Sequence, residues 1–285
     1  MTTKLRFTLA ALLAIGLLLS ACGSGAAGPG DSESAAPADE ESAAPQESAP
    51  PEEAEEAAAP TITEGVLTVC TDSPYPPMEF EKNGEFTGFD IELMRAVADE
   101  MGGLTVEVNN TGFDPITSGT ALESDQCDIA AASITITPER EEFIAFTEPY
   151  FDAEQSLLVK KDSGIAALED LAGKRIAVQS GTTGKKYAEK NAPESEVVAF
   201  DNPGDIFLAI EAGDVEAVVQ DLVVNGPRAV KDPSVEVVET YSTDEQYGFA
   251  LALDNTELLD AVNEALAALQ DNGTYDDLFK EWFGG

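Results

Sequence analysis

From residue 66 onward, short apolar runs alternate with amphipathic stretches along the chain. Residues 66–70 form a β-prone run that leads into Thr-Asp-Ser-Pro, which predicts a strand followed by a loop. Between residues 91 and 101 the apolar positions recur at helical spacing, and Asp90 stands where it could cap that helix. Two further strands are expected at residues 104–108 and 128–132, with a helix at residues 114–122 between them. This order of strands and helices predicts a parallel α/β sheet.

A second set of the same kind follows and predicts a lobe of its own. Strands are expected at residues 174–179, 196–200 and 215–220, each followed by a helix. An apolar strand comes next at residues 247–253, and then a long helix whose apolar face carries four leucines and a valine. Gly273 ends that helix, and a short aromatic helix follows it.

Ligands of open α/β sheets bind beyond the carboxyl ends of the strands, near the helix N-termini. This rule selects residues 71–75, 133–137 and 180–183, together with Asp221. It also bears on Cys70 and Cys127, which stand at opposite ends of two expected parallel strands. About four residues of rise would separate them, on the order of 13 Å, whereas a disulfide needs Cα atoms within ~7 Å. We therefore expect two buried free thiols.

The N-terminus predicts a signal peptide over residues 1–22. Lys4 and Arg6 precede an apolar run at residues 7–21, and its 15 residues are too few to span a bilayer comfortably. The run ends in Leu-Ser-Ala before Cys22, which resembles the lipobox of bacterial lipoproteins and implies a multiply acylated cysteine. An ordinary secretory signal with a chance cysteine is the alternative interpretation.

Residues 23–60 contain only Ala, Gly, Ser, Pro, Gln, Asp and Glu, which predicts a disordered, extended acidic linker. The whole chain carries 55 acidic and 15 basic residues, a formal net charge of −40, which excludes a nucleic-acid-binding protein. It contains no histidine, and this excludes histidine-based triads and histidine metal sites. We expect neither a catalytic residue nor a metal or cofactor.

Seven short blocks follow one another in the folded part, at residues 70–80, 88–90, 135–140, 146–150, 179–183, 220–221 and 272–275. With these blocks in this order, the chain from Leu67 to Phe283 resembles the amino-acid-binding branch, family 3, of the type 2 periplasmic solute-binding proteins, which serve ABC importers. The resemblance implies lobe 1 at residues 61–154 and 246–285, lobe 2 at residues 155–245, and two crossing strands between them. Met78 stands where the family usually has phenylalanine.

An amino acid carries one carboxylate and one ammonium, and an unpaired buried charge is costly. Arg140 is the candidate for the carboxylate, because a guanidinium can donate two parallel hydrogen bonds. Thr135 and Thr182 are expected to add donors, and the helix that begins near Thr182 offers free N–H groups. Alternatively, Arg140 is a surface residue paired with a neighbouring glutamate, and Thr182 simply caps its helix.

Asp221 is the candidate for the ammonium, with Ser133 as a further acceptor. Asp221 could also cap the helix that begins at Leu222, and the two roles are compatible. Because these residues come from both lobes, the ligand would favour the closed form.

Tyr75 and Phe113 are expected to wall the side-chain end of the site, although Phe113 could equally belong to the core. By resemblance, Asp72 and Gln179 face the ligand's side chain. One carboxylate and one neutral amide favour arginine, lysine or ornithine, with glutamine next. Asp72 could instead cap its own loop.

We therefore expect a monomeric, lipid-anchored protein on the extracytoplasmic face of the cell membrane, which delivers a polar amino acid to an ABC permease. One alternative is a dehydratase of the prephenate or arogenate type on the same fold, with Asp72 or Glu79 as the acid. A sensory ligand domain is a further alternative, and it would need a transmembrane helix and an effector domain.

Overall fold

The computed structural model describes residues 60–284. These residues belong to one compact unit, residues 55–285. The predicted signal peptide, Cys22 and nearly all of the linker lie outside the described residues. Within the described part of the chain, no helix is long and apolar enough to cross a membrane.

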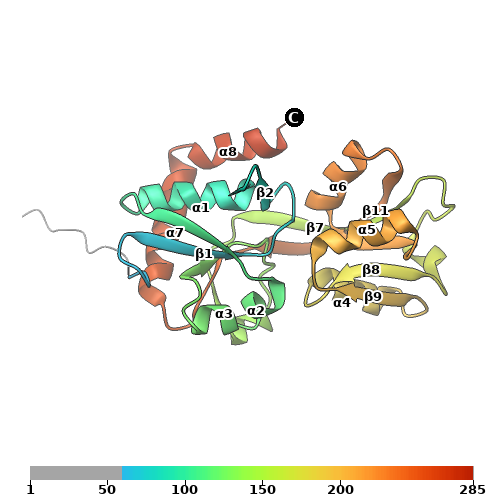
Figure 1. Ribbon diagram of the computed structural model, residues 1–285, viewed down its shortest axis with the longest axis horizontal. Coiled ribbons are helices and arrows are strands. Elements are labelled where there is room, and N and C mark those ends of the chain that lie inside the picture. The colour runs from blue at the N-terminus through green and yellow to red at the C-terminus, as the bar shows by residue number, and fades with distance from the viewer. Residues whose placement is uncertain (1–59, 285) are drawn as a thin grey trace, which may run out of the picture. The chain divides into compact units, whose positions relative to one another are not determined.

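The first lobe is built on a five-stranded sheet in the order β4-β1-β5-β12-β6. Strands β4, β1 and β5 are parallel, and β12 runs antiparallel to both β5 and β6. Figure 1 shows α1 and α8 on one side of this sheet and α2 with α3 on the other. The strands are β1 (Val66–Thr71), β4 (Thr105–Asn110), β5 (Ile129–Ala130), β6 (Ala145–Phe146) and β12 (Ala250–Leu251). The helices are α1 (Phe89–Glu100), α2 (Phe113–Thr117), α3 (Thr120–Glu123), α7 (Thr256–Asp271) and α8 (Thr274–Phe283).

The second lobe has a five-stranded sheet in the order β11-β7-β10-β8-β9. Strands β10, β8 and β9 are parallel, whereas β7 is antiparallel to β10 and β11 is antiparallel to β7. The strands are β7 (Phe151–Lys160), β8 (Arg175–Gln179), β9 (Glu196–Phe200), β10 (Ala217–Asp221) and β11 (Val235–Tyr247). The helices are α4 (Thr183–Asn191), α5 (Pro203–Ala212) and α6 (Leu222–Lys231). A separate hairpin joins β2 (Phe80–Lys82) to β3 (Glu85–Thr87).

Two long strands join the lobes, as the resemblance implied. The chain leaves the first lobe along β7 and returns along β11, and the two pair from Val235 opposite Lys160 to Tyr247 opposite Phe151. The predicted α/β class with two lobes and two crossing strands is confirmed. Each predicted lobe boundary falls inside one of these strands, so the exact borders stay a prediction.

The predicted capping role of Asp90 is wrong. Helix α1 begins at Phe89, directly after its N-cap residue Gly88, and the Asp90 side chain makes no capping hydrogen bond. Gly88 has a φ of 126°, and a Cβ there would lie 2.2 Å from the carbonyl oxygen of Met78, so only glycine fits. Met78 itself is fully buried in the core of this lobe. Asp90, in the first turn of α1, is fully buried.

Two predicted elements of the first lobe are shorter than expected. The helix expected at residues 114–122 is split into α2 and α3 at Gly119, which adopts a left-handed conformation. A Cβ at Gly119 would lie 2.7 Å from the carbonyl oxygen of Phe143, so the helix breaks where another segment passes close by. The strand expected at residues 128–132 shrinks to β5, and the chain then turns at Ser133, whose φ is 49°.

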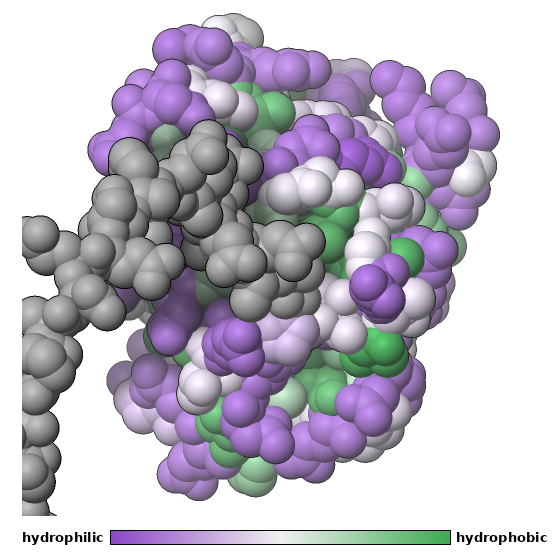
Figure 2. Space-filling model, turned by 90° about the vertical axis from the view of Figure 1, so that its left-hand side faces the viewer, coloured by the Kyte–Doolittle hydropathy of each residue, from purple (hydrophilic) through white to green (hydrophobic). Residues whose placement is uncertain are grey.

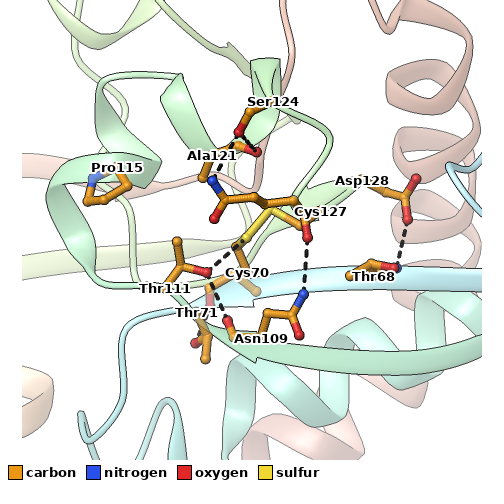
Figure 3. The surroundings of a disulfide bond; sticks show 12 residues. Thr68, Cys70, Thr71, Asn109, Thr111, Pro115, Ala121, Ser124, Cys127 and Asp128 are labelled. Atoms are coloured by element: carbon orange, nitrogen blue, oxygen red, sulfur yellow. Dashed lines mark hydrogen bonds between the residues drawn. A yellow bond between two sulfur atoms is a disulfide. The ribbon is translucent and has the colours of Figure 1, made fainter.

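The expectation of free thiols is also wrong, because Cys70 and Cys127 form a disulfide with Cα atoms 5.6 Å apart (Figure 3). Strand β5 does not extend back to Cys127. Residues 124–128 form a turn, in which Asp125 has a φ of 55°. The turn carries Gln126 back to Asn109, the β4 partner of Cys70, and Asn109 donates a hydrogen bond of 3.0 Å to the Gln126 carbonyl. The rise of an extended strand therefore does not separate the two cysteines, because the chain before β5 is bent.

The charge surplus is carried largely at the surface. On the face drawn in Figure 2, hydrophilic residues predominate and the hydrophobic ones are scattered. A net charge of −40 favours solubility, and the mutual repulsion of the carboxylates opposes the compact state.

We predict that removing the disulfide with the double variant Cys70→Ser/Cys127→Ser lowers the free energy of unfolding by about 2–4 kcal/mol. The bond closes a loop between residues 57 positions apart and thereby restricts the unfolded chain. Urea unfolding followed by circular dichroism measures the change. Added dithiothreitol should bring the wild type to the stability of the double variant and leave the double variant unchanged. A wild-type midpoint that ignores the reductant would contradict the prediction.

Candidate ligand-binding site

A small cavity lies between the two lobes, at the carboxyl ends of the parallel strands. Its volume is about 20 Å³, close to the space of one water molecule. The structure brings all nine sequence-predicted residues to this cavity, and it adds Glu79, Ala132 and Thr183. The nine are Asp72, Tyr75, Phe113, Ser133, Thr135, Arg140, Gln179, Thr182 and Asp221.

Arg140 lies in a short 3₁₀ turn and is only 6% exposed. Its guanidinium donates to the Thr135 carbonyl at 2.7 Å and, across the cleft, to the Gly181 carbonyl at 3.1 Å. It also lies 5.0 Å from the centre of the Phe113 ring, within range of a cation–π contact. None of the ion pairs among the described residues includes Arg140, so the alternative of a surface pair with Glu141 or Glu142 is wrong.

Burial lowers the pKa of Arg140, and the nearby carboxylates of Asp221 and Glu245 act against that shift. A guanidinium keeps its charge at neutral pH even when buried. Arg140 therefore places a fixed positive charge at the cavity, with one face against an aromatic ring. This arrangement is suited to binding a carboxylate.

Thr182 stands at the N-terminus of α4 in the second lobe. Its hydroxyl accepts from the Lys185 N–H at 3.1 Å and donates to the Gln179 carbonyl at 2.8 Å. Thr182 is thus a helix cap, as the alternative interpretation held, and it also lines the cavity. A carboxylate at this end of α4 would lie at the positive end of the helix dipole.

Asp221 ends strand β10 and is 9% exposed. Its carboxylate accepts from the Tyr75 hydroxyl of the first lobe at 2.6 Å and from the Tyr247 hydroxyl at 2.7 Å. The Gln155 amide donates to its other oxygen. Asp221 occupies the N-cap position of α6 but makes no side-chain capping bond, so the predicted capping role is wrong. Burial raises the pKa of Asp221, and the hydrogen bonds oppose that rise.

Asp72 and Gln179 meet across the cleft. The Gln179 amide donates to the Asp72 carboxylate, so Asp72 points to the opposite lobe and not to its own loop. Burial raises the pKa of Asp72 to about 6. The Ser73 N–H, which a loop cap at Asp72 could have bound, donates instead to Asn110 at 3.1 Å.

Glu79 and Asp90 form a pair of buried carboxyl groups behind Ser133, whereas the sequence offered Glu79 only as the acid of a dehydratase and Asp90 only as a helix cap. The Ser133 hydroxyl donates to Glu79 at 3.2 Å, and its N–H donates to Asp90 at 2.8 Å. Tyr150 donates to the other oxygen of Asp90, also at 2.8 Å. Burial raises the pKa of Asp90 to about 7, and burial together with the charge of Asp90 raises that of Glu79. The signal for Glu79 was an acidic residue inside the otherwise apolar block at residues 74–80.

The site therefore has an excess of acidic groups. Four buried carboxyls surround the cavity or lie directly behind it, against one guanidinium, and burial raises the pKa of each of the four. A cation that entered this cavity would be attracted by these groups and would lower their pKa values. The four are Asp72, Glu79, Asp90 and Asp221.

Two lobes joined by paired crossing strands, with a polar cleft between them, define a solute-binding protein of the type 2 fold. The family described as bacterial extracellular solute-binding proteins, family 3, matches residues 67–285, and the chain belongs to it. ABC transporter arginine-binding protein 1 of Escherichia coli K12 is 34% identical over 215 residues, which cover 73% of this chain and 87% of the relative. The glutamine-binding protein GlnH of Bacillus subtilis 168 is 31% identical, over 76% of this chain and 80% of the relative.

Solved structures agree with this assignment. A mutant of the arginine-binding protein from T. maritima matches with a TM-score of 0.73 and 36% identity, over 78% of this chain and 96% of that one. An ancestral arginine-binding protein bound to glutamine matches with a TM-score of 0.73 and 38% identity, over 78% and 100%.

The raised carboxyl pKa values predict the pH dependence of stability. A carboxyl whose pKa is higher in the folded than in the unfolded state binds its proton more tightly when folded. It therefore stabilises the fold at low pH, and that stability is lost as the pH rises from about 4, past the folded pKa values of about 6 for Asp72 and 7 for Asp90. We expect the free energy of unfolding to fall between pH 5 and pH 8.

Asp72→Asn isolates one of these groups, because an amide keeps an acceptor for Gln179 and cannot ionise. We predict that this variant is about 2 kcal/mol more stable than the wild type at pH 8 and equally stable near pH 4. Urea unfolding at each pH measures the difference. Glu236→Gln, on an exposed part of β11, is the control and should follow the wild type. A wild-type stability that rises up to pH 8 would contradict the prediction.

Proposed function

We propose that this chain is the extracytoplasmic solute-binding component of an ABC importer and that it binds a polar amino acid by closure of its lobes. One observation carries the proposal: Arg140 of the first lobe and Asp221 of the second line the same cavity. A guanidinium and a carboxylate on opposite walls complement the carboxylate and ammonium of an amino acid. The relatives support the class of ligand, since they include arginine-, glutamine- and histidine-binding proteins.

The charge of the site favours a ligand with a cationic side chain. Arg140 and Asp221 would offset the two charges of the amino-acid backbone, which leaves Asp72 and Glu79 without a cationic partner. A guanidinium or ammonium at the end of the side chain would pair with these carboxyls. A neutral amide could bind Gln179 and Asp72 by hydrogen bonds alone. We propose arginine, lysine or ornithine as the preferred ligand, with glutamine next.

Closure follows from contacts that only the closed form makes. Tyr75 with Asp221, Asp72 with Gln179, and Arg140 with the Gly181 carbonyl all join the two lobes. A cavity of about 20 Å³ is too small for an amino acid, so the ligand must take over some of these bonds as it enters. A shift from 1:99 to 99:1 in favour of the closed form requires ~5.5 kcal/mol of differential binding. Two to four charge-assisted hydrogen bonds at ~1.5–3 kcal/mol each would supply it.

Titration calorimetry with each common amino acid tests the proposal. We expect the tightest binding for arginine, lysine or ornithine, and we expect Arg140→Ala to weaken it at least about 100-fold, because a buried carboxylate would lose its cation. Arg175→Ala is the matched control, since Arg175 pairs with Glu216 at the surface and should leave the affinity unchanged.

If no amino acid binds more tightly than millimolar, the proposed ligand class is wrong. An intact affinity in Arg140→Ala would overturn the carboxylate assignment. The dehydratase alternative has one observation in its favour, a 39% identical structure of an ancestral amino acid-binding protein that is a precursor of cyclohexadienyl dehydratase. If the protein converts prephenate or arogenate to product, it is an enzyme and the binding-only proposal is wrong.

We further propose that Cys22 is lipidated and anchors the protein to the outer face of the cell membrane. The support is the sequence before Cys22 and the extracellular family of the folded part. An alkyne analogue of palmitate fed to expressing cells should label the wild type. Label should be lost in Cys22→Ser and kept in the control Cys70→Ser/Cys127→Ser, which retains Cys22. An unlabelled wild type would contradict the proposal.

A further inference from the structure

A carboxylate on a crossing strand lies behind the part of the cavity assigned to the ligand's carboxylate. Glu245 belongs to β11, and one of its oxygens accepts three hydrogen bonds. The donors are the hydroxyl of Thr183 at 2.9 Å, the amide of Gln155 at 3.1 Å and the hydroxyl of Thr135 at 3.2 Å. Thr135 is in the first lobe and Thr183 in the second, so Glu245 joins both lobes to the crossing strands.

An irregularity in β11 sets this side chain in place. Tyr241 pairs with Gln155, whereas Glu245 pairs with Ala153, so β11 advances four residues while β7 advances two. Asp244, directly before Glu245, adopts a φ of 53°. Bulges of this kind redirect side chains and occur next to functional sites. A non-glycine residue in the left-handed region costs conformational energy and persists only where the surroundings hold it.

The hydrogen bonds of Glu245 use up donors that a ligand would need. A threonine hydroxyl has one hydrogen, and a carboxylate can only accept, so the hydrogens of Thr135 and Thr183 point to Glu245. Both threonines line the cavity, while the Thr182 hydroxyl donates to the Gln179 carbonyl. The three hydroxyls at this end of the cavity therefore donate to acceptors of the protein itself.

We propose that Glu245 is a built-in competitor of the ligand's α-carboxylate. It holds Thr135 and Thr183 until a carboxylate enters, and its own negative charge then opposes that carboxylate. Glu245 thereby acts as a positioning residue that lowers affinity and speeds release, which suits a protein that must hand its ligand to a transporter. This inference rests on the proposed function, because it assumes that the ligand carries a carboxylate.

Glu245→Gln tests the competition, since glutamine keeps the size of the side chain and one acceptor but removes the charge. We expect the variant to bind its best amino acid about tenfold more tightly, mainly through a slower dissociation rate in stopped-flow measurements. The same amino acid with its carboxylate converted to an amide should bind the wild type and Glu245→Gln within about twofold. A merely structural role of Glu245 would not distinguish these two ligands. Glu236→Gln, at an exposed position of the same strand, is the matched control and should equal the wild type for both.

Several outcomes would overturn the proposal. One is that Glu245→Gln binds the amino acid no better than the wild type, and another is that the amide ligand gains as much as the acid. If Glu245→Gln unfolds, Glu245→Ala provides the same test, because it removes the charge and frees the hydroxyls of Thr135 and Thr183. Glu245→Ala should also bind the amino acid more tightly than the wild type and bind the amide ligand within about twofold of it. A wild type that binds no amino acid would contradict the proposed function as well, whereas a binding wild type without the gain contradicts only the role of Glu245.

Discussion

The hydrogen bonds to the carboxylate of Asp221 are the interaction on which the rest of the closed structure depends. It accepts hydrogen bonds from Tyr75 of the first lobe, from Tyr247 on β11 and from Gln155 on β7. One buried group at the end of β10 thus contacts the opposite lobe and both crossing strands. A carboxylate without these donors would be too costly to bury, and the hydroxyls of Tyr75 and Tyr247 would be left unpaired without it. The carboxylate of Asp221 therefore both holds the two lobes together and contributes a negative charge to the site.

The fold brings these atoms together by a simple rule of parallel sheets. Strands β1, β8 and β10 each end at the cleft. Gln179 and Asp221 are the last residues of β8 and β10, and Asp72 directly follows β1. The disulfide supports this arrangement from the first lobe, since Cys70 is next to the end of β1 and shares a buried cluster with Phe113. The side chain of Phe113 in turn lies under the guanidinium of Arg140. The buried cluster around the disulfide therefore contacts, through Phe113, the guanidinium that carries the positive charge of the cavity.

The sequence pattern was sufficient for most of this, because periodicity and strand ends depend on local composition. It predicted both ends of β9 and placed the starts of α4 and α6 within one residue, and the strand-end rule with the family resemblance selected nine residues that do meet at one cavity. The pattern failed where the chain bends at positions that the spacing of apolar residues does not mark. The turn before Cys127 and the break at Gly119 depend on single left-handed residues and on segments that pass close by. Gln155 and Glu245 were missed because they meet only through the pairing of strands far apart in sequence.

Buried carboxyls have one further consequence for how the cleft works. Asp72 and Asp221 each accept a hydrogen bond from the opposite lobe, and burial raises the pKa of both, so closure without a cation leaves two carboxyls in a costly environment. Opening returns part of this acidic surface to water, and a bound cation removes the same cost without opening. A positively charged ligand therefore stabilises the closed form in two ways, through the bonds it makes and through the repulsion it relieves. A neutral ligand has only the first, so the acidic cleft can discriminate between ligands through closure itself, in addition to direct contact.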